Sequence, residues 1–125
     1  MIDVSLDDKL YFQVNMNEGF CFGTTFWNPT ITYEDSTICQ ASEGFSDIQE
    51  QGQWHYQYWD SKNYMNMVCD QSFKIWRGKN APNIPSITSD RQHPSEGLDT
   101  ARVFVVPKDG TISLIGAPSA LGTPY

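Results

Sequence analysis

The chain has 125 residues, 14% of them aromatic, and a formal net charge of −7 at pH 7. This length fits one ordinary domain, and the aromatic side chains supply ample apolar surface for its core. The negative charge argues against binding to nucleic-acid phosphates or anionic membranes, because both attract clustered Lys and Arg. The sequence also has no apolar run long enough to span a bilayer. We therefore expect one domain over residues 1–125, with no nucleic-acid partner and no membrane insertion.

The first predicted element is a hairpin over residues 10–27. Apolar and polar side chains alternate from Leu10 to Met16, which is typical of a strand with one buried face. The residues Asn17-Glu18-Gly19 supply a three-residue turn with glycine where a positive φ is needed. Closing the hairpin on this turn predicts three apolar pairs: Met16 with Phe20, Val14 with Phe22, and Leu10 with Phe26.

The second predicted element is a three-stranded meander over residues 53–77. Its strands are Trp54–Trp59, Tyr64–Cys69 and Phe73–Arg77, joined by turns at Asp60–Asn63 and Asp70–Ser72. Loop length alone then fixes the register, and the apolar partners fall on one face in both hairpins. The predicted pairs are Tyr58 with Met65, Tyr56 with Met67, Trp54 with Cys69, Cys69 with Phe73, and Met67 with Ile75. This register predicts a buried row of Tyr56, Met67 and Ile75.

The same stretch also fits one amphipathic helix over residues 61–77. Asp60 would cap its start, Gly78 would follow its end, and Lys74 and Arg77 would lie near the negative end of the helix dipole. The fold would then be α+β. We favour the meander, because the helix does not require the agreement between the two strand registers.

Residues 78–100 follow without hydrophobic periodicity and contain Pro82, Pro85 and Pro94. A segment of this length without regular structure is uncommon inside a compact domain. Ordering it costs backbone entropy that few apolar side chains are present to offset. We expect an irregular loop or arm over residues 78–100. We also expect contacts with another copy or another protein to hold both this segment and the last ten residues in place. The tail 116–125 is predicted to be extended.

The third predicted hairpin covers residues 101–116 around Pro107-Lys108-Asp109-Gly110. Proline presets the first turn position and glycine ends the turn. This register predicts Val105 opposite Ile112 and Val103 opposite Leu114. Three hairpins at short intervals predict a mainly β fold, namely an antiparallel β-sandwich or small barrel.

Cysteine usage and the first residues bear on the cellular location. Cys21, Cys39 and Cys69 are odd in number and have no CxxC spacing, so a disulfide framework is not expected and a reducing compartment is. Residues 1–10 have neither the basic nor the apolar region of a signal peptide. We expect a cytoplasmic location, or a virion if the protein is a particle component.

Groups that could perform catalysis are sparse. His55 and His93 are the only histidines, and the sequence contains no nucleophile, phosphate-loop or zinc-protease motif. We expect no catalytic residues, no metal site and no cofactor, and therefore a protein that is not an enzyme.

The second face of the predicted meander is the candidate binding surface. It combines flat aromatic rings with amide and imidazole groups: His55, Gln57, Trp59, Tyr64, Asn66 and Trp76. Sugars stack their C–H faces on aromatic rings and bind amides through their hydroxyl groups, whereas Trp and Tyr also anchor protein interfaces. The alternative is that a second sheet or residues 78–100 cover this face.

Two functions follow from these observations. The first is a non-enzymatic structural or assembly protein, such as an accessory (decoration, tail or fibre-type) component of a virus or phage particle. Such a protein would be a homo- or hetero-oligomer held by other protein subunits. The alternative is a carbohydrate-binding module or lectin that binds a glycan on the aromatic face.

Overall fold

The computed structural model describes residues 1–15, 25–49, 52–78, 85–95 and 97–120. Within these ranges the protein contains fourteen β-strands and no helix. All strand pairs are antiparallel, and they form three sheets. The fold is therefore mainly β and sandwich-like, as predicted. The alternative with a helix over residues 61–77 is wrong.

Two sheets have four strands each. In spatial order, sheet A consists of β1 (Ile2–Val4), β13 (Gly110–Ile115), β4 (Thr30–Tyr33) and β5 (Ile38–Gln40). Sheet B consists of β2 (Lys9–Val14), β12 (Asp99–Val105), β6 (Trp54–Trp59) and β7 (Tyr64–Asn66).

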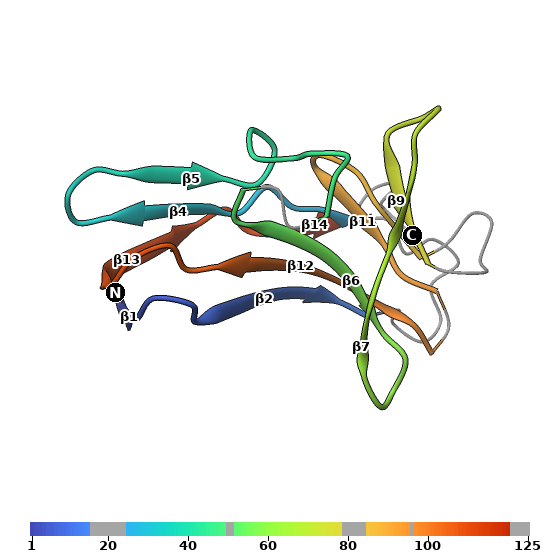
Figure 1. Cartoon of the computed structure of the whole chain (residues 1–125), viewed down its shortest axis with the longest axis horizontal. Coiled ribbons are helices and arrows are strands. Elements are labelled where there is room, and N and C mark those ends of the chain that lie inside the picture. Colours follow the sequence, from blue (N-terminus) through green and yellow to red (C-terminus); the bar gives the residue numbers. More distant parts are fainter. Residues whose placement is uncertain (16–24, 50–51, 79–84, 96, 121–125) are drawn as a thin grey trace.

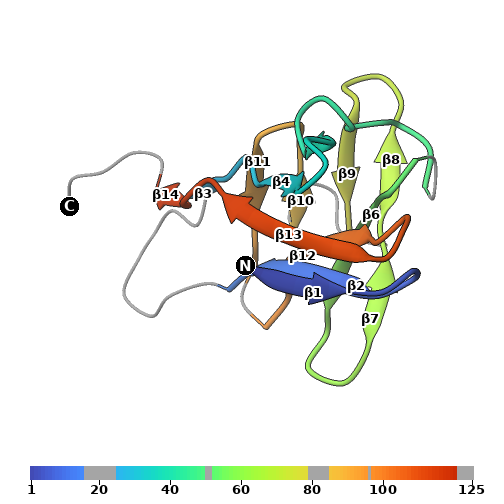
Figure 2. The ribbon, with the colours of Figure 1, turned by 90° about the vertical axis from the view of Figure 1, so that its left-hand side faces the viewer.

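Sheet C has six short strands. In spatial order they are β14 (Ser119–Ala120), β3 (Thr25–Phe26), β11 (Arg91–His93), β10 (Ser86–Ile87), β9 (Ile75–Arg77) and β8 (Val68–Asp70). Figure 1 shows β9 running steeply across the strands of sheets A and B, and Figure 2 shows β8 and β9 side by side at one edge.

The chain repeatedly bends from one sheet into the next. It passes between sheets A and B after β1 and after β12, and hydrogen bonds join these two crossings: Asp7 N–H to Val106 O at 2.9 Å, and Val106 N–H to Asp8 O at 2.8 Å. It passes from sheet B to sheet C at Met67, between β7 and β8. Such bends form the corners of sandwiches whose sheets cross at a large angle.

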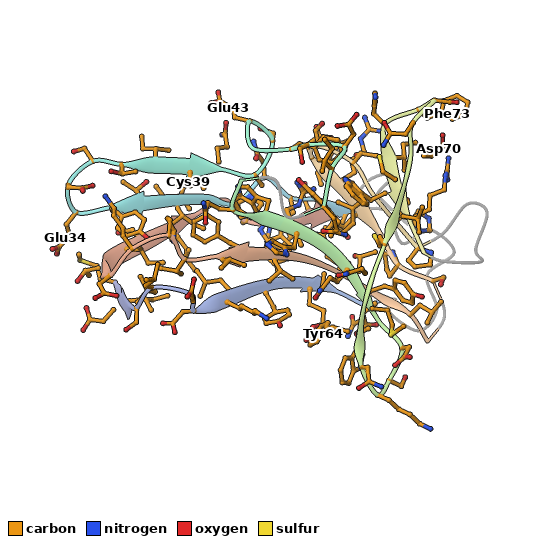
Figure 3. All side chains as sticks on the ribbon, in the orientation of Figure 1. Glu34, Cys39, Glu43, Tyr64, Asp70 and Phe73 are labelled. Carbon is orange, nitrogen blue, oxygen red and sulfur yellow. The ribbon has the colours of Figure 1, made fainter. Side chains whose placement is uncertain are left out.

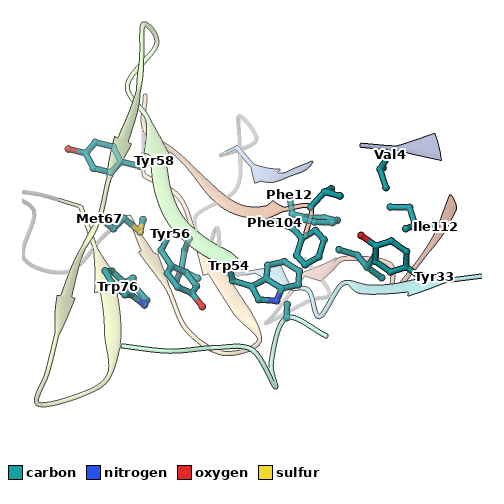
Figure 4. Close-up of a cluster of buried hydrophobic side chains, with 14 residues drawn as sticks. Val4, Phe12, Tyr33, Trp54, Tyr56, Tyr58, Met67, Trp76, Phe104 and Ile112 are labelled. Carbon is teal, nitrogen blue, oxygen red and sulfur yellow. The ribbon is translucent and has the colours of Figure 1, made fainter. Parts of the chain in front are cut away.

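The core lies between the inner faces of the three sheets (Figure 4). Trp54 packs against Phe104 with ring centroids 4.9 Å apart. Trp76 stacks on Tyr56 at 4.8 Å with an interplanar angle of 12°. The buried apolar side chains of sheet A that belong to the same cluster are Val4, Ile31, Tyr33 and Ile112.

The first half of the predicted meander is confirmed. Tyr58 pairs with Met65, and the Met67 N–H donates a hydrogen bond of 2.9 Å to the Tyr56 carbonyl. Trp54, however, pairs with Phe104 of β12 and not with Cys69. The reason is that the strand turns away into sheet C at Met67.

The second half of the meander has the wrong register. Cys69 pairs with Trp76 and Asp70 with Ile75, because the loop holds four residues, Gln71–Lys74, and not three. The carboxylate of Asp70 accepts the backbone N–H groups at positions 72 and 73 and so holds this longer loop. A slip by an odd number of residues exchanges the two faces of a strand. Trp76 is consequently buried, whereas Ile75 is only partly buried. Tyr56 and Met67 are buried as predicted.

The other two predicted hairpins are also wrong. Leu10 pairs with Phe104, and Phe26 pairs with Arg91 and Ser119. The predicted pair of Met16 with Phe20 lies outside the described residues, and so does Phe22, the predicted partner of Val14; Val14 itself pairs with Thr100. The prediction failed because it paired neighbours in sequence, whereas β2 pairs with β12 from the far end of the chain.

Strands β12 and β13 follow one another but belong to different sheets. Val103 pairs with Tyr11 and His55, and Leu114 pairs with Ile31. The turn-forming residues before Gly110 therefore make a crossing between sheets A and B, not a hairpin. The side chains of β12 on the core side are Thr100, Arg102 and Phe104, which pair with the buried tyrosines and tryptophan of β6.

Residues 78–100 are less irregular than predicted. Strands β10 and β11 form a hairpin within sheet C, and Ile87 and Gln92 are fully buried by the protein's own sheets. The isolated bridge between Ser95 and Leu98 adds further order. The described part of this segment thus has contacts within the chain itself, whereas the predicted contacts with another copy or another protein stay a prediction.

Candidate binding face of sheet B

The candidate site is the face of sheet B that points away from the core. Strand β6 alternates strictly: Trp54, Tyr56 and Tyr58 are buried, whereas His55, Gln57 and Trp59 are partly exposed. Each residue of a strand shares a face with its direct partner on the next strand. The pairings therefore define what we call the outer face, whose aromatic, polar and charged side chains include Tyr11, Gln13, His55, Gln57, Trp59, Tyr64, Asn66 and Asp99; Ala101 and Val103 of β12 belong to the same face.

Three aromatic rings form a continuous group on the outer face. The ring centroids of Tyr11 and Tyr64 lie 4.5 Å apart, and those of Trp59 and Tyr64 lie 4.8 Å apart. Tyr11 and Tyr64 come from the two edge strands of sheet B, so their rings lean over the strands between them. Ala101 of β12, on the same face between the two edge strands, is fully buried and has only a methyl side chain. Tyr11 and Tyr64 remain 39% and 37% exposed.

Hydrogen bonds fix the polar groups around these rings. The Tyr64 hydroxyl donates to Gln13 Oε1 at 2.6 Å, and Gln13 Nε2 donates to Asp99 Oδ2 at 2.9 Å. Partial burial raises the pKa of Tyr64, and the nearby Tyr11 and Asp99 raise it further. Tyr64 therefore stays a protonated donor at neutral pH.

A second polar pair lies beside the first. Gln57 Nε2 donates to Asn66 Oδ1 at 2.9 Å, across the β6–β7 pairing. Each primary amide has two donor hydrogens and an acceptor oxygen, so one mutual hydrogen bond leaves both with capacity for a ligand. The outer face thus presents preset donors and acceptors next to exposed rings.

The turn at Asp60–Asn63 places Trp59 and Tyr64 side by side. Asp60 Oδ1 accepts the backbone N–H groups of Asn63 at 2.7 Å and Lys62 at 2.9 Å. These two hydrogen bonds hold the pKa of Asp60 below its usual value, and the bond from Asn63 has the larger effect. Ser61 has a φ of 80°, which completes the tight turn. Local turn chemistry therefore fixes one end of the aromatic group.

Five of the six residues predicted for this site lie on the outer face. Trp76 does not, because the shifted register turns it into the core, where its Nε1–H donates to Ser46 O at 2.8 Å. The prediction missed Tyr11, Gln13 and Asp99, because β2 and β12 were not expected beside β6. The alternation of β2 was visible in the sequence, and it assigns Tyr11 and Gln13 to the face opposite Phe12.

Other kinds of site find no support in the part of the chain that the structure describes. No group of three or more His, Cys, Asp or Glu side chains among the described residues could hold a metal ion. The described residues also contain no helix long and apolar enough to cross a membrane.

Comparison with protein-family models, with curated proteins and with solved structures finds no match for this chain.

Proposed function

We propose that the protein is a non-enzymatic binding protein whose outer face of sheet B recognises a carbohydrate. The observation that carries this proposal is the contiguous group of Tyr11, Trp59 and Tyr64, partly exposed and surrounded by ordered amides. The described part of residues 78–100 has ordered contacts within the chain itself, which weakens one reason for preferring the assembly role. The carbohydrate function therefore takes first place.

The chemistry of the face suits a sugar. The faces of aromatic rings carry partial negative charge and attract the C–H groups of a pyranose. Hydroxyl groups need both donors and acceptors at short range, which Gln57, Asn66 and Asp99 offer together. Because the hydrogen bonds among these side chains already order them, little conformational entropy remains to be lost on binding.

A glycan array probed with purified protein tests the proposal. We expect signals on a limited set of glycans, and we expect Trp59→Ala and Tyr64→Ala to remove them without unfolding the protein. Phe73→Ala is the matched control, since Phe73 is 70% exposed but lies on the β8–β9 turn, far from Tyr64 (Figure 3). A blank array, or signals that survive in both outer-face variants, would contradict the proposal.

The assembly role is the second candidate, and one feature of sheet A favours it. Ile38 and Ile115 are 64% and 62% exposed, and both lie on the face of sheet A that points away from the core. Exposed apolar side chains that share a sheet face mark interaction surfaces when they form a patch. Such a protein would join other subunits of a larger particle, as expected for a virus or phage component.

Sedimentation velocity separates the two candidates. An assembly protein should form oligomers that dissociate in an Ile115→Lys variant, while a Val68→Lys variant, altered at an exposed position of sheet C, should keep them. A monomer at high protein concentration would argue against self-assembly through this face.

A further inference from the structure

A pocket separate from the outer face of sheet B lies at one end of sheet C. It has a volume of about 460 Å³ and lies between the β8–β9 turn and the β10–β11 turn. This volume falls within the range of small-molecule sites, roughly 300–1,000 Å³. Its apolar wall consists of Phe45, Phe73 and Ile75, and its charged side chains are Lys74, Asp90 and Arg91.

The charge around this pocket differs in sign from that of the whole protein. The chain carries a net charge of −7. Lys74, whose Nζ lies 2.7 Å from the Asp47 carboxylate, is already paired. Arg91 lies 3.6 Å from the neighbouring Asp90, with both side chains about half exposed. The Arg91 guanidinium also lies over the Phe26 ring, 4.8 Å from its centroid. An exposed ion pair as long as that with Asp90 contributes little, so a ligand carboxylate can replace Asp90 while the guanidinium keeps its contact with Phe26.

A third cation lies behind the pocket wall. Arg102 is fully buried, and its guanidinium donates to the carbonyl oxygens of Ser89 at 3.0 Å and Thr88 at 2.5 Å, residues that line the pocket. Its Nε has no hydrogen-bond partner, and no ion pair joins it to a carboxylate among the described residues. Burial lowers the pKa of Arg102 to about 10, so it remains charged at neutral pH.

Arg102 therefore adds positive charge behind the pocket, where it interacts electrostatically with the Asp90 carboxylate without a direct ion pair. Charges interact more strongly where the surroundings exclude water. With Asp47 included, the pocket and its surroundings hold three cations against two carboxylates. A ligand that matches this site has one negative charge and an apolar body.

We propose that this pocket binds a small aromatic carboxylate, with the carboxylate on Arg91 and the ring against Phe73. A guanidinium and a carboxylate form paired, charge-assisted hydrogen bonds, which are the strong ones. The exposed Phe73 ring is covered by the ligand, which accounts for an otherwise costly apolar side chain at a turn. This inference is independent of the carbohydrate proposal, since Phe73 and Tyr64 lie on opposite sides of the molecule (Figure 3).

A titration with benzoate, monitored through the backbone amide signals in NMR spectra, tests the inference. Benzamide serves as the uncharged isostere. We expect benzoate to shift the amide signals of residues 88–91 with a dissociation constant on the order of 1 mM. Benzamide should bind about tenfold more weakly or worse, because it lacks the charge-assisted bond. The same loss is expected for benzoate in Arg91→Gln, and a smaller one in Phe73→Ala.

Lys108→Gln is the control variant, because Lys108 pairs with Asp35 at the turns of sheet A, far from the pocket. It should bind benzoate as the wild type does. The inference is overturned if benzamide binds as well as benzoate, or if Arg91→Gln binds as well as Lys108→Gln. It is also overturned if the signals of residues 88–91 do not respond to benzoate.

Discussion

Strand β6 carries a tryptophan at each end, and the two rings have opposite surroundings. Trp54 points into the core, only 3% exposed, with its ring 4.9 Å from Phe104 and 6.0 Å from Phe12. Trp59 lies on the outer face beside Tyr64 and remains partly exposed. The same residue type thus stabilises the fold at one end of the strand and is available for binding at the other.

The two faces of sheet B differ in how their aromatic side chains are surrounded, and this difference separates the core from the proposed binding surface. The inner face buries aromatic side chains that belong to one hydrophobic core cluster. On the outer face, aromatic side chains alternate with amides, and hydrogen bonds hold those amides in place without covering the rings. Alternation along the strand therefore buries one face in the core and leaves the other available for the proposed binding.

The largest expected effect comes from replacing these two tryptophans. Trp54→Ala should lower the free energy of unfolding by about 3–5 kcal/mol, because it leaves a large cavity in the core. Trp59→Ala should cost about 0.5–1.5 kcal/mol, the value of its ring contact with Tyr64. Urea unfolding of the two variants measures both values. Equal losses would remove the distinction between the faces.

Two methionines around the bend from sheet B to sheet C give the next largest effect. Met67, 3% exposed, packs in the core, whereas Met65, two residues earlier, is 39% exposed. Met67→Ala should cost about 2–5 kcal/mol. Met65→Ala should stay within about 1 kcal/mol, since its side chain loses little contact. Thermal unfolding compares them, and a Met67→Ala variant as stable as Met65→Ala would contradict the observed bend.

Ala101 offers a test confined to the outer face. Ala101→Leu adds bulk at a fully buried position of the outer face, between the strands that carry Tyr11 and Tyr64, and should cost about 1–3 kcal/mol. It should also weaken glycan binding, because the two rings must separate. The conservative control is Val105→Leu, whose partly exposed side chain lies farther along the same strand and should retain binding. Unchanged binding in Ala101→Leu would show that the ring contact is not needed.

The smallest expected effect concerns the turn that positions Trp59 and Tyr64. Asp60 has a lower pKa in the folded protein than in the unfolded chain, so its ionised form favours folding. This contribution is present above the unfolded pKa of about 3.9 and is lost as the pH falls through the folded pKa. Asp60→Asn should therefore reduce the dependence of stability on pH below about pH 4. An identical acid titration of the variant and the wild type would contradict this role.

Local signals in the sequence account for the parts of the fold that were predicted correctly. The side chain of Asp60 closes the turn at Asp60–Asn63 through hydrogen bonds within the turn. Loop length therefore gives the right register for β6 and β7. The same reasoning failed at Asp70, where a loop one residue longer is held by similar hydrogen bonds. Turn composition does not distinguish the two lengths, and the choice of face for Trp76 depends on that length.

Pairing between distant strands was not accessible from local patterns. The pairing of β12 with both β2 and β6 places three further residues on the candidate site: Tyr11, Gln13 and Asp99. The burial of Arg102 was equally hidden, because a charged residue between apolar neighbours, here Ala101 and Val103, normally indicates the solvent side of a strand. Five residues of the site were still found, because the β6–β7 hairpin is local and brings them together without help from the rest of the sheet.

The central claim is that the outer face of sheet B binds a carbohydrate. NMR tests it most directly through the side-chain amide signals of Gln13, Gln57 and Asn66. Titration with the glycan that gives the strongest array signal should shift all three. The amide of Gln92, fully buried in the core, should stay unchanged. Shifts confined to sheet C or to the edges of sheet A, with the three outer-face amides unaffected, would contradict a carbohydrate site on sheet B.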